Sequence, residues 1–312
     1  MEFKIIYGNH HHGAVQIYDT LMLLKHGLES AGHKADLEAN LCPGKTNILI
    51  EFFTWDFVDV LRDVAKVPGT EFIVIATEYL TGETFNNFDN LPLDQITPQH
   101  SHYDDLRHWR KRYRTFREVL GHARAVWHLS ELQVRPYRAQ LGFEKVFYLP
   151  HGYMQAMQRV TQKPAAHKDI DVIFTGTRTP YRDGVLRTLE AQGLVVRQLP
   201  ILTGEFVRED MVARAKLALN IRQHANWRYP SNSRFYYHLM NRSMIITESC
   251  EERCDLSDYV CEASPDALVS TVLECIQQGS YQHLADTRLA QFRDEMPMAP
   301  RMTVLLDATY AE

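Results

Sequence analysis

Three consecutive histidines, His10, His11 and His12, lie between Gly8 and Gly13 near the start of this 312-residue chain. Imidazole exchanges protons near neutral pH, donates hydrogen bonds to phosphate groups and ligates metal ions. Adjacent histidines rarely all reach one ion, and the histidine pairs that bind metal from a helix are four residues apart. We therefore expect no metal here and favour acid–base or diphosphate contact by His11 or His12. A metal site and a polar loop without a role are the alternatives.

Carboxylates in the same half of the chain are the other candidates for a general base. Such a base needs a pKa near the working pH and a place beside the substrate hydroxyl. Glu78 directly follows the apolar run at 71–76, and loops after parallel strands are where ligands bind. Asp104 and Asp105 lie farther along, in a less regular segment. The sequence thus predicts catalysis by His11, His12 or Glu78, with His10 and the two aspartates as further candidates.

A second group of chemically capable residues lies in the sequence DVIFTGTRTPYRDG. Gly176, Arg178 and Arg182 follow an apolar run at 171–175 and precede a predicted helix at 184–192. A glycine there lets the backbone approach a ligand, the helix N-terminus favours an anion, and guanidinium groups suit phosphate. The sequence is neither a Walker loop nor a GxGxxG fingerprint. It predicts a phosphate-binding turn, with an ordinary turn carrying solvated arginines as the alternative.

A third group stands in the sequence ALNIRQHANWRYPSNSRFYYHL. Ser231 and Ser233 come just before a predicted helix, and Arg234 opens it. Hydroxyl groups and free amides at a helix N-terminus form a good seat for a diphosphate, and Arg234 could neutralise a leaving diphosphate. Simple capping of the helix by serine is the alternative, and both can hold together.

Apolar runs alternate with amphipathic stretches along the whole chain, which predicts strands alternating with helices. In the first half the predicted strands are 3–7, 47–52, 71–76, 125–129 and 145–149, and the helices are 15–31 and 55–65. In the second half the strands are 171–175, 194–199, 217–221 and 243–247, and the helices are 184–192, 209–215, 233–241 and 265–278. This alternation predicts an α/β protein with two doubly wound, Rossmann-like parallel sheets.

The predicted domains are an N-terminal one over 1–153, a polar linker over 154–168 and a C-terminal one over 169–295. Ligands bind outside the carboxyl ends of parallel strands. If both domains turn those ends toward each other, the cleft between them becomes the site.

The second half of the chain resembles GT-B glycosyltransferases, in particular the CgeB-like spore-protein glycosyltransferase group. The resemblance rests on the loop with Gly176 and Arg178, the helix opened by Arg234, and the sequence AVWHLSELQVRPYRAQLGFEKVFYLPHGY before them. It covers roughly 125–275. It implies transfer of a sugar from a nucleotide sugar, without a metal or other cofactor, to an unidentified glycan, lipid-linked, protein or nucleic-acid acceptor. The donor would lie on the C-terminal domain and the acceptor on the N-terminal one, with 296–312 crossing back to the latter.

One position departs from that family pattern. Many GT-B enzymes hold the donor ribose with a glutamate in the helix that follows the serine–arginine turn, where this chain has Tyr237 and His238. Ribose contact would then fall to His238, Tyr237 or Glu248. A nucleotide-sugar epimerase shares the expected architecture, and a non-catalytic nucleotide- or glycan-binding module would explain the missing glutamate. Both are alternatives to a transferase.

The sequence DLRHWRKRYRTFREVL predicts an amphipathic helix over 106–120. Its polar face is basic and its other face carries aromatic and apolar residues. A solvated surface is one interpretation, and the other is contact with an anionic acceptor: a lipid-linked glycan at a membrane surface, an acidic polysaccharide or a nucleic acid. Tyr103, Trp109 and Tyr113 could also line an acceptor groove. The basic residues are Arg107, Arg110, Lys111, Arg114 and Arg117.

Composition limits the partners and the cellular compartment that we expect for this protein. The formal net charge of -5 gives no global reason for nucleic-acid binding. No apolar run is long enough to span a bilayer, and the first residues do not form a signal peptide. The five cysteines lack framework spacing, so we expect free thiols and a cytoplasmic protein. Zinc held by Cys250, Cys254 and Cys261 is the alternative.

Overall fold

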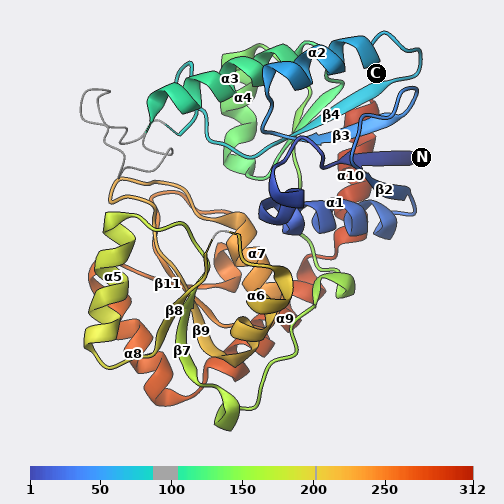
Figure 1. The fold of residues 1–312 in the computed structure, drawn as a ribbon. Helices are drawn as coiled ribbons and strands as arrows, with labels where there is room; N and C mark the ends of the chain where they lie inside the picture. Colours follow the sequence, from blue (N-terminus) through green and yellow to red (C-terminus); the bar gives the residue numbers. More distant parts are fainter. Residues whose placement is uncertain (87–104, 201, 312) are drawn as a thin grey trace. The chain divides into compact units, whose positions relative to one another are not determined.

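Two compact units make up the computed structural model, which describes residues 1–86, 105–200 and 202–311 (Figure 1). Unit 1 comprises Met1–Ala14, Leu24–Pro150 and Ala299–Glu312, and unit 2 comprises Val15–Leu23 and His151–Met298. Each unit contains one parallel sheet and its own buried core. The predicted fold class, α/β with two doubly wound parallel sheets, is confirmed.

Unit 1 is built on a six-stranded sheet in the order β2–β1–β3–β4–β5–β6. Every neighbouring pair of these strands is parallel. Its strands are β1 (Glu2–Ile6), β2 (Lys34–Glu38), β3 (Thr46–Ile50), β4 (Glu71–Ala76), β5 (Ala125–His128) and β6 (Val146–Tyr148). Its helices are α2 (Trp55–Val64), α3 (Leu106–Leu120) and α4 (Val134–Leu141). The 3₁₀ helix η4 (Glu131–Gln133) directly precedes α4. The 3₁₀ helix η1 (His12–Ile17) and helix α1 (Tyr18–Ser30) follow β1, and part of each belongs to unit 2.

Unit 2 has a five-stranded parallel sheet in the order β11–β10–β9–β7–β8. Its strands are β7 (Ile170–Phe174), β8 (Val196–Gln198), β9 (Ala215–Asn220), β10 (Ile245–Glu248) and β11 (Cys261–Ala263). Its α-helices are α5 (Pro180–Ala191), α6 (Glu205–Arg214), α7 (Asn232–Met240), α8 (Leu268–Gln278) and α9 (Tyr281–Glu295). Short 3₁₀ helices are η5 (Gln155–Met157), η6 (Ala165–His167), η7 (Ser257–Tyr259) and η8 (Pro265–Ala267).

The two faces of the unit 1 sheet are covered by different helices. Helices α2, α3 and α4 bury one face, on which Val126 packs. The neighbouring residue Trp127 points to the opposite face, because side chains alternate along a strand. There its Nε1 donates a hydrogen bond of 2.8 Å to Thr309 Oγ1 of the last helix, α10 (Met298–Tyr310). Coverage on both faces explains why β3 and β4 are continuous apolar runs.

Local sequence signals account for where the site-bearing helices begin. Thr179 caps α5 by accepting a hydrogen bond from the Arg182 backbone N–H, with Pro180 in the first turn, so α5 starts earlier than the predicted 184. Asp105 caps α3 in the same way, and α3 spans the predicted 106–120. Strands β2 and β11 and helix α9 (Tyr281–Glu295) were not predicted from the sequence. Strand β2 is partly polar and partly exposed, and β11 has three residues, so neither shows the apolar pattern of an interior strand.

Three expectations from the sequence concern membrane-spanning segments, free cysteines and a zinc site. In the described ranges, every helix falls short of the length and apolar character that a bilayer span requires. All five cysteines are free. Within those ranges, no three His, Cys, Asp or Glu side chains lie close enough together to hold a metal ion, so the alternative zinc cluster at Cys250, Cys254 and Cys261 is not formed there.

Candidate functional site

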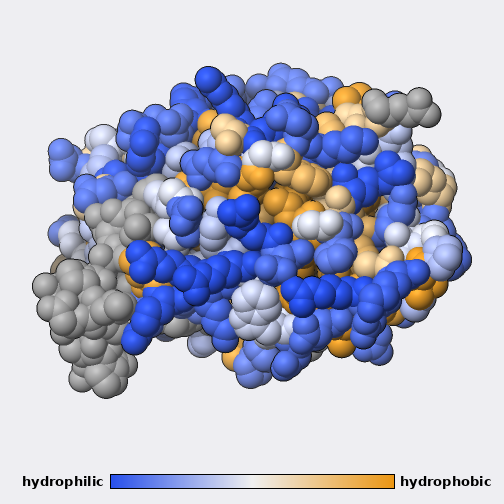
Figure 2. Space-filling view, turned by 90° about the horizontal axis from the view of Figure 1, so that it is seen from above, coloured by the Kyte–Doolittle hydropathy of each residue, from blue (hydrophilic) through white to orange (hydrophobic). Residues whose placement is uncertain are grey.

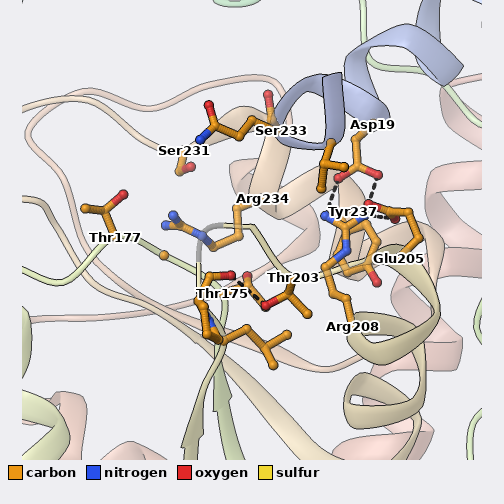
Figure 3. Close-up of a pocket in the computed structure, with 15 residues that line it drawn as sticks. Asp19, Thr175, Thr177, Thr203, Glu205, Arg208, Ser231, Ser233, Arg234 and Tyr237 are labelled. Carbon is orange, nitrogen blue, oxygen red and sulfur yellow. Dashed lines mark hydrogen bonds and ion pairs between the residues drawn. The ribbon is translucent and has the colours of Figure 1, made fainter. Parts of the chain in front are cut away.

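A cavity of about 290 Å³ opens in unit 2 at the carboxyl ends of β7 and β8 (Figure 3). It is bordered by the loop after β7, which contains Gly176, by Leu199 and Pro200 after β8, and by the N-terminal end of α7. The first turn of α1, which belongs to unit 2, adds Asp19. Predicted donor residues Gly176, Ser231, Ser233 and Arg234 all line this cavity.

Two arginines line the cavity, Arg208 and Arg234, and Arg208 is paired with Asp19 and Glu205. The Arg234 side chain extends from α7 toward the side where Thr177 and Ser231 lie (Figure 3). Its Nη1 donates to Asn220 Oδ1, and burial lowers the pKa of the guanidinium to about 10. Among the residues that the structure describes, Arg234 has no carboxylate at ion-pair distance. A charge withdrawn from water without a counter-ion is unfavourable, so this arrangement favours an anion in the cavity.

The N-terminus of α7 supplies further donors beside Arg234. Ser231 is the capping residue, but its hydroxyl makes no capping hydrogen bond and remains available to a ligand. Ser233 is exposed and lines the cavity. The first amides of a helix lack partners within the helix and carry its positive dipole end. A cation, serine hydroxyls and a helix N-terminus together can hold a diphosphate.

Gly176 is required by close packing rather than by a special backbone angle. A Cβ at this position would lie 2.6 Å from Phe174 Cζ and 2.9 Å from Arg234 Nη2. The absence of a side chain therefore lets Arg234 lie against the loop after β7.

We expect Gly176→Ala to weaken anion or donor binding about tenfold, because the added methyl displaces the Arg234 guanidinium. Titration calorimetry measures the dissociation constant. Gly184→Ala in α5 is the matched control, since a Cβ there meets nothing within 4 Å. Equal dissociation constants for both variants and the parent would contradict the packing role.

The other predicted donor residues do not line the cavity. Arg182 is buried, and its guanidinium donates to the carbonyls of Ile221, Arg222 and Thr177, so it braces the loops. Burial lowers the pKa of Arg182 to about 9. The Arg178 side chain is 63% exposed and pairs with Asp183 at 2.7 Å. Neither arginine lines this cavity, and their contact with a diphosphate stays a prediction.

His238 and Glu248, the predicted ribose contacts, are buried elsewhere in unit 2. His238 Nε2 lies 3.3 Å from Thr175 Oγ1 and its Nδ1 lies 3.2 Å from Ser243 Oγ. Burial lowers the pKa of His238 to about 3, so the ring is neutral. The Glu248 carboxylate accepts from Tyr181 Oη and from the backbone and side chain of Arg222. Through these contacts both residues connect neighbouring elements inside unit 2.

Tyr237, the other residue predicted to contact the ribose, lines the cavity. The residue is 5% exposed, and its Oη has no hydrogen-bond partner in the described ranges. The Arg208 guanidinium carbon lies 4.1 Å from the centre of its ring, and Arg208 pairs with Asp19 and Glu205 at 2.7 and 2.5 Å. Burial raises the pKa of Tyr237, so the hydroxyl stays protonated. The hydroxyl is therefore a buried donor on a residue that lines the cavity on the side opposite the Arg234 head group (Figure 3).

Tyr237→Phe should leave the free energy of unfolding nearly unchanged and weaken ligand binding about tenfold, because the hydroxyl lacks a partner until a ligand arrives. Thermal unfolding and calorimetry measure the two quantities. Tyr236→Phe is the adjacent control: its hydroxyl donates to Gly152 O at 2.8 Å, so that variant should lose about 1 kcal/mol of stability and keep its affinity. A destabilised Tyr237→Phe with unchanged affinity would contradict the assignment.

Unit 1 contains a second cluster, centred on Glu78 after β4. The Glu78 backbone carbonyl accepts from His128 Nε2 at 3.0 Å and from Tyr137 Oη at 2.6 Å. Ser130 N donates to His128 Nδ1, which places the imidazole proton on Nε2, and burial lowers the pKa of His128 to about 4. Asn86 Nδ2 donates to the Glu78 carboxylate at 2.5 Å. Backbone and side chain of Glu78 are both fixed, which is preorganisation of the kind found at catalytic groups.

Arg112 joins Glu78 to a second carboxylate. Its Nη2 lies 2.7 Å from Glu78 Oε1, and its Nε and Nη2 both donate to Glu51. Glu51 is 2% exposed, and its burial raises the pKa of the carboxyl although Arg112 opposes the shift. The Glu78 side chain is 18% exposed and is the member of this group most open to a substrate. Two carboxylates share one guanidinium, so the group can accept a proton.

The histidine loop lies at the same edge of the sheet. His10 Nε2 lies 3.3 Å from Ile50 O, and burial lowers the pKa of His10 to about 4. His11 and His12 are exposed. The Phe52 ring lies 6.0 Å from His11, and the Arg112 guanidinium carbon lies 5.1 Å from the same ring. The edge therefore brings His11 and the Arg112 guanidinium, which pairs with Glu78, near one aromatic ring.

Backbone strain is concentrated at this edge. Phe52 has φ 150°, His12 has φ 56°, Ala14 has φ 62° and Asn86 has φ 50°. Positive φ is unfavourable for residues other than glycine, and such strain clusters at binding and catalytic sites.

The remaining predicted acceptor residues fall into three groups. Arg107, Arg110 and Arg114 are exposed on α3, as are Lys111 and Arg117. Trp109 and Tyr113 are buried in the core, so the prediction that they line an acceptor groove is wrong. Asp105 caps α3 and pairs with Arg107, while Tyr103 and Asp104 lie outside the described residues.

Comparison with known proteins identifies the fold. No family model matches the chain, and no curated protein matches it. Solved structures do. T4 phage β-glucosyltransferase matches with a TM-score of 0.55 and 13% identity, covering 100% of both chains. AviGT4, a glycosyltransferase of avilamycin A biosynthesis, matches with a TM-score of 0.54 and 11% identity, covering 99% of this chain and 97% of its own. The chain spans only 55% of TarM, at a TM-score of 0.49 and 9% identity. The fold is GT-B.

Proposed function

We propose that this protein is a glycosyltransferase that moves a sugar from a nucleotide sugar to an acceptor hydroxyl. The observation that carries the proposal is the partly buried Arg234, which has no carboxylate partner in the described ranges and stands beside the N-terminus of α7. That arrangement suits a diphosphate, the group that leaves when a nucleotide sugar donates its sugar. The T4 phage enzyme, which shares the fold, has been solved with UDP-glucose as its substrate, and this supports the same donor class.

The acceptor is placed on unit 1 in this proposal, with Glu78 as the general base. The base removes the hydroxyl proton as the acceptor oxygen bonds to the anomeric carbon and the carbon–oxygen bond to the diphosphate breaks. Arg234 then neutralises the leaving diphosphate. His11 and His12, exposed at the same edge, are the alternative bases.

The proposal also covers the cofactor requirement, the cellular compartment and the family group. Arg234 and the α7 N-terminus supply the positive charge that a diphosphate needs, so the proposed reaction uses no resident metal or cofactor. The five free thiols support a reducing compartment, the cytoplasm. Membership of the CgeB-like group is supported by the loop of Gly176 and the helix of Arg234 that suggested it.

A thermal-shift panel of nucleotides and nucleotide sugars tests the donor site. A ligand that binds the folded state raises the melting temperature in proportion to its affinity and concentration. We expect a shift with at least one nucleoside diphosphate sugar and none with the free sugar. The absence of a shift with every nucleotide would overturn the proposal.

The products separate a transferase from its rivals. A transferase releases free nucleotide slowly when water replaces the acceptor, whereas an epimerase converts the sugar of the donor without releasing nucleotide. A non-catalytic module shifts the melting temperature and changes nothing in the donor. Chromatography of the incubated donor distinguishes the three.

A further inference from the structure

Helix α3 of unit 1 carries a row of cations on its outer face. The helix contains six Arg or Lys residues and a single Glu, and Arg112 is its only buried cation. Figure 2 shows a surface on which hydrophilic residues predominate, with hydrophobic residues gathered near the centre of the view. The following four residues, here called the α3 cation row, are exposed and make no ion pair within the described ranges: Arg110, Lys111, Arg114 and Arg117.

An exposed indole lies beside the row. Helices α2 and α3 each connect parallel strands of one sheet, so they run in the same direction, and they pack together. Arg62 of α2 pairs with Glu118 of α3 at 2.6 Å, which fixes their relative height. Seven residues are nearly two helical turns, so the residue seven positions before Arg62 lies on the same side of α2 as Arg62. In the same way, the residue seven positions before Glu118 lies on the same side of α3 as Glu118. This brings Trp55, 42% exposed, level with Lys111.

This combination selects a class of polyanion. A phosphodiester backbone offers one charge after another to a line of cations, and an aromatic side chain beside that line accepts an unpaired base by stacking. Guanidinium groups, which supply three of the four cations, suit phosphate. A membrane surface is less well matched, because every exposed residue of α3 is charged and has no apolar group to enter the acyl layer.

The surface is connected to the proposed acceptor site. Trp55 follows Phe52 by three residues, and the Phe52 ring lies 5.1 Å from the guanidinium carbon of Arg112, which holds Glu78. Both helices begin at the carboxyl edge of the sheet, where Glu78 lies. A strand lying along the α3 cation row would thus lead toward the proposed base.

We propose that the outer face of α2 and α3 binds a single-stranded or locally unpaired polynucleotide, with phosphates on the α3 cation row and a base stacked on Trp55. The polynucleotide is the acceptor of the transferase, a hydroxyl on one of its nucleotides receiving the sugar. The acceptor role rests on the proposed function, whereas the binding itself does not.

Fluorescence anisotropy of a labelled single-stranded oligonucleotide of about 20 nucleotides tests the binding, at salt concentrations from about 50 to about 200 mM. We expect affinity to fall steeply with salt, and the slope of log affinity against log salt to shrink by about 0.7 for each cation removed. The test variant carries Arg110→Gln, Lys111→Gln, Arg114→Gln and Arg117→Gln together. Trp55→Ala should weaken binding about tenfold and remove quenching of the protein fluorescence, and Trp55→Phe should restore most of the affinity.

The matched control removes equal charge from exposed positions of unit 2. It carries Lys163→Gln, Arg187→Gln, Arg253→Gln and Arg293→Gln, and we expect it to bind as the parent does. Equal binding by both quadruple variants, or no binding at low salt, would overturn the proposal. So would tighter binding to heparin or to phosphatidylserine vesicles, which would assign the face to an acidic glycan or a membrane. If no nucleotide sugar shifted the melting temperature but the oligonucleotide still bound, the proposed transferase function would be rejected. The proposed polynucleotide-binding surface would be retained.

Discussion

Arg234→Met should abolish nucleotide-sugar binding and at the same time raise the melting temperature of the ligand-free protein. Truncating one partner of a buried charge contact costs about 2–5 kcal/mol of binding, which is at least a thirtyfold rise in the dissociation constant. The same change removes an uncompensated cation from a partly buried position, and a thioether of similar length fills its space. Calorimetry measures the first effect and thermal unfolding without ligand measures the second.

Arg178→Met is the matched control for that experiment, because it removes an arginine from the loop after β7, a strand of the same sheet as the strand β9 that precedes Arg234. Its side chain is mostly exposed and pairs with Asp183, and exposed pairs contribute about 0–1 kcal/mol. We expect its affinity and its melting temperature to match the parent. Loss of donor binding in Arg178→Met with retention in Arg234→Met would reverse the assignment.

Glu78→Gln is expected to lower the rate of donor turnover by about 10²–10⁴-fold and to leave donor affinity unchanged. Glutamine has nearly the shape of glutamate and can keep the hydrogen bond to Arg112, but it cannot take the acceptor proton. Release of nucleotide from the donor identified in the thermal-shift panel, followed with and without acceptor, gives the rate. Calorimetry on the same variant gives the affinity.

Glu83→Gln, an exposed carboxylate of the same loop, is the control and should turn over donor at the parent rate. His11→Ala and His12→Ala are compared beside it. If either histidine variant lost 10²-fold or more while Glu78→Gln stayed active, the histidine loop would hold the base and Glu78 would be a support.

The architecture and part of the cavity lining could be predicted from the sequence because they depend on local patterns. Interior strands such as β4 consist mainly of apolar residues in an unbroken run. Arg234 lies at the start of a helix, and Ser231 and Ser233 predict that start from the sequence. The roles of Arg182 and Arg234 could not be told apart. Both follow a strand of the same sheet, and only the carbonyls of Ile221 and Arg222, brought close by the fold, hold Arg182 inside.

The Glu51–Arg112–Glu78 group was missed for a related reason. Its members lie on three elements far apart in the sequence, so no spacing rule joins them. One local signal was present: Arg112 follows Trp109 by three residues and precedes Phe116 by four, which places it on the apolar side of α3. An arginine at that phase of an amphipathic helix needs a buried carboxylate, and Glu51 ends the apolar run of β3. The Tyr237 hydroxyl had no such signal, since its lack of a partner is visible only after folding.

If Arg234, which has no carboxylate partner in the described ranges, binds the donor as proposed, the lifetime of the protein depends on the supply of donor. An empty cavity leaves the folded state less stable than it could be, and each tenfold rise in free donor above its dissociation constant adds about 1.4 kcal/mol. Proteases act on the unfolded fraction, which a change of this size alters about tenfold. A cell short of the proposed donor would then clear the protein faster than a well-fed one, and abundance would follow metabolism without any dedicated regulator.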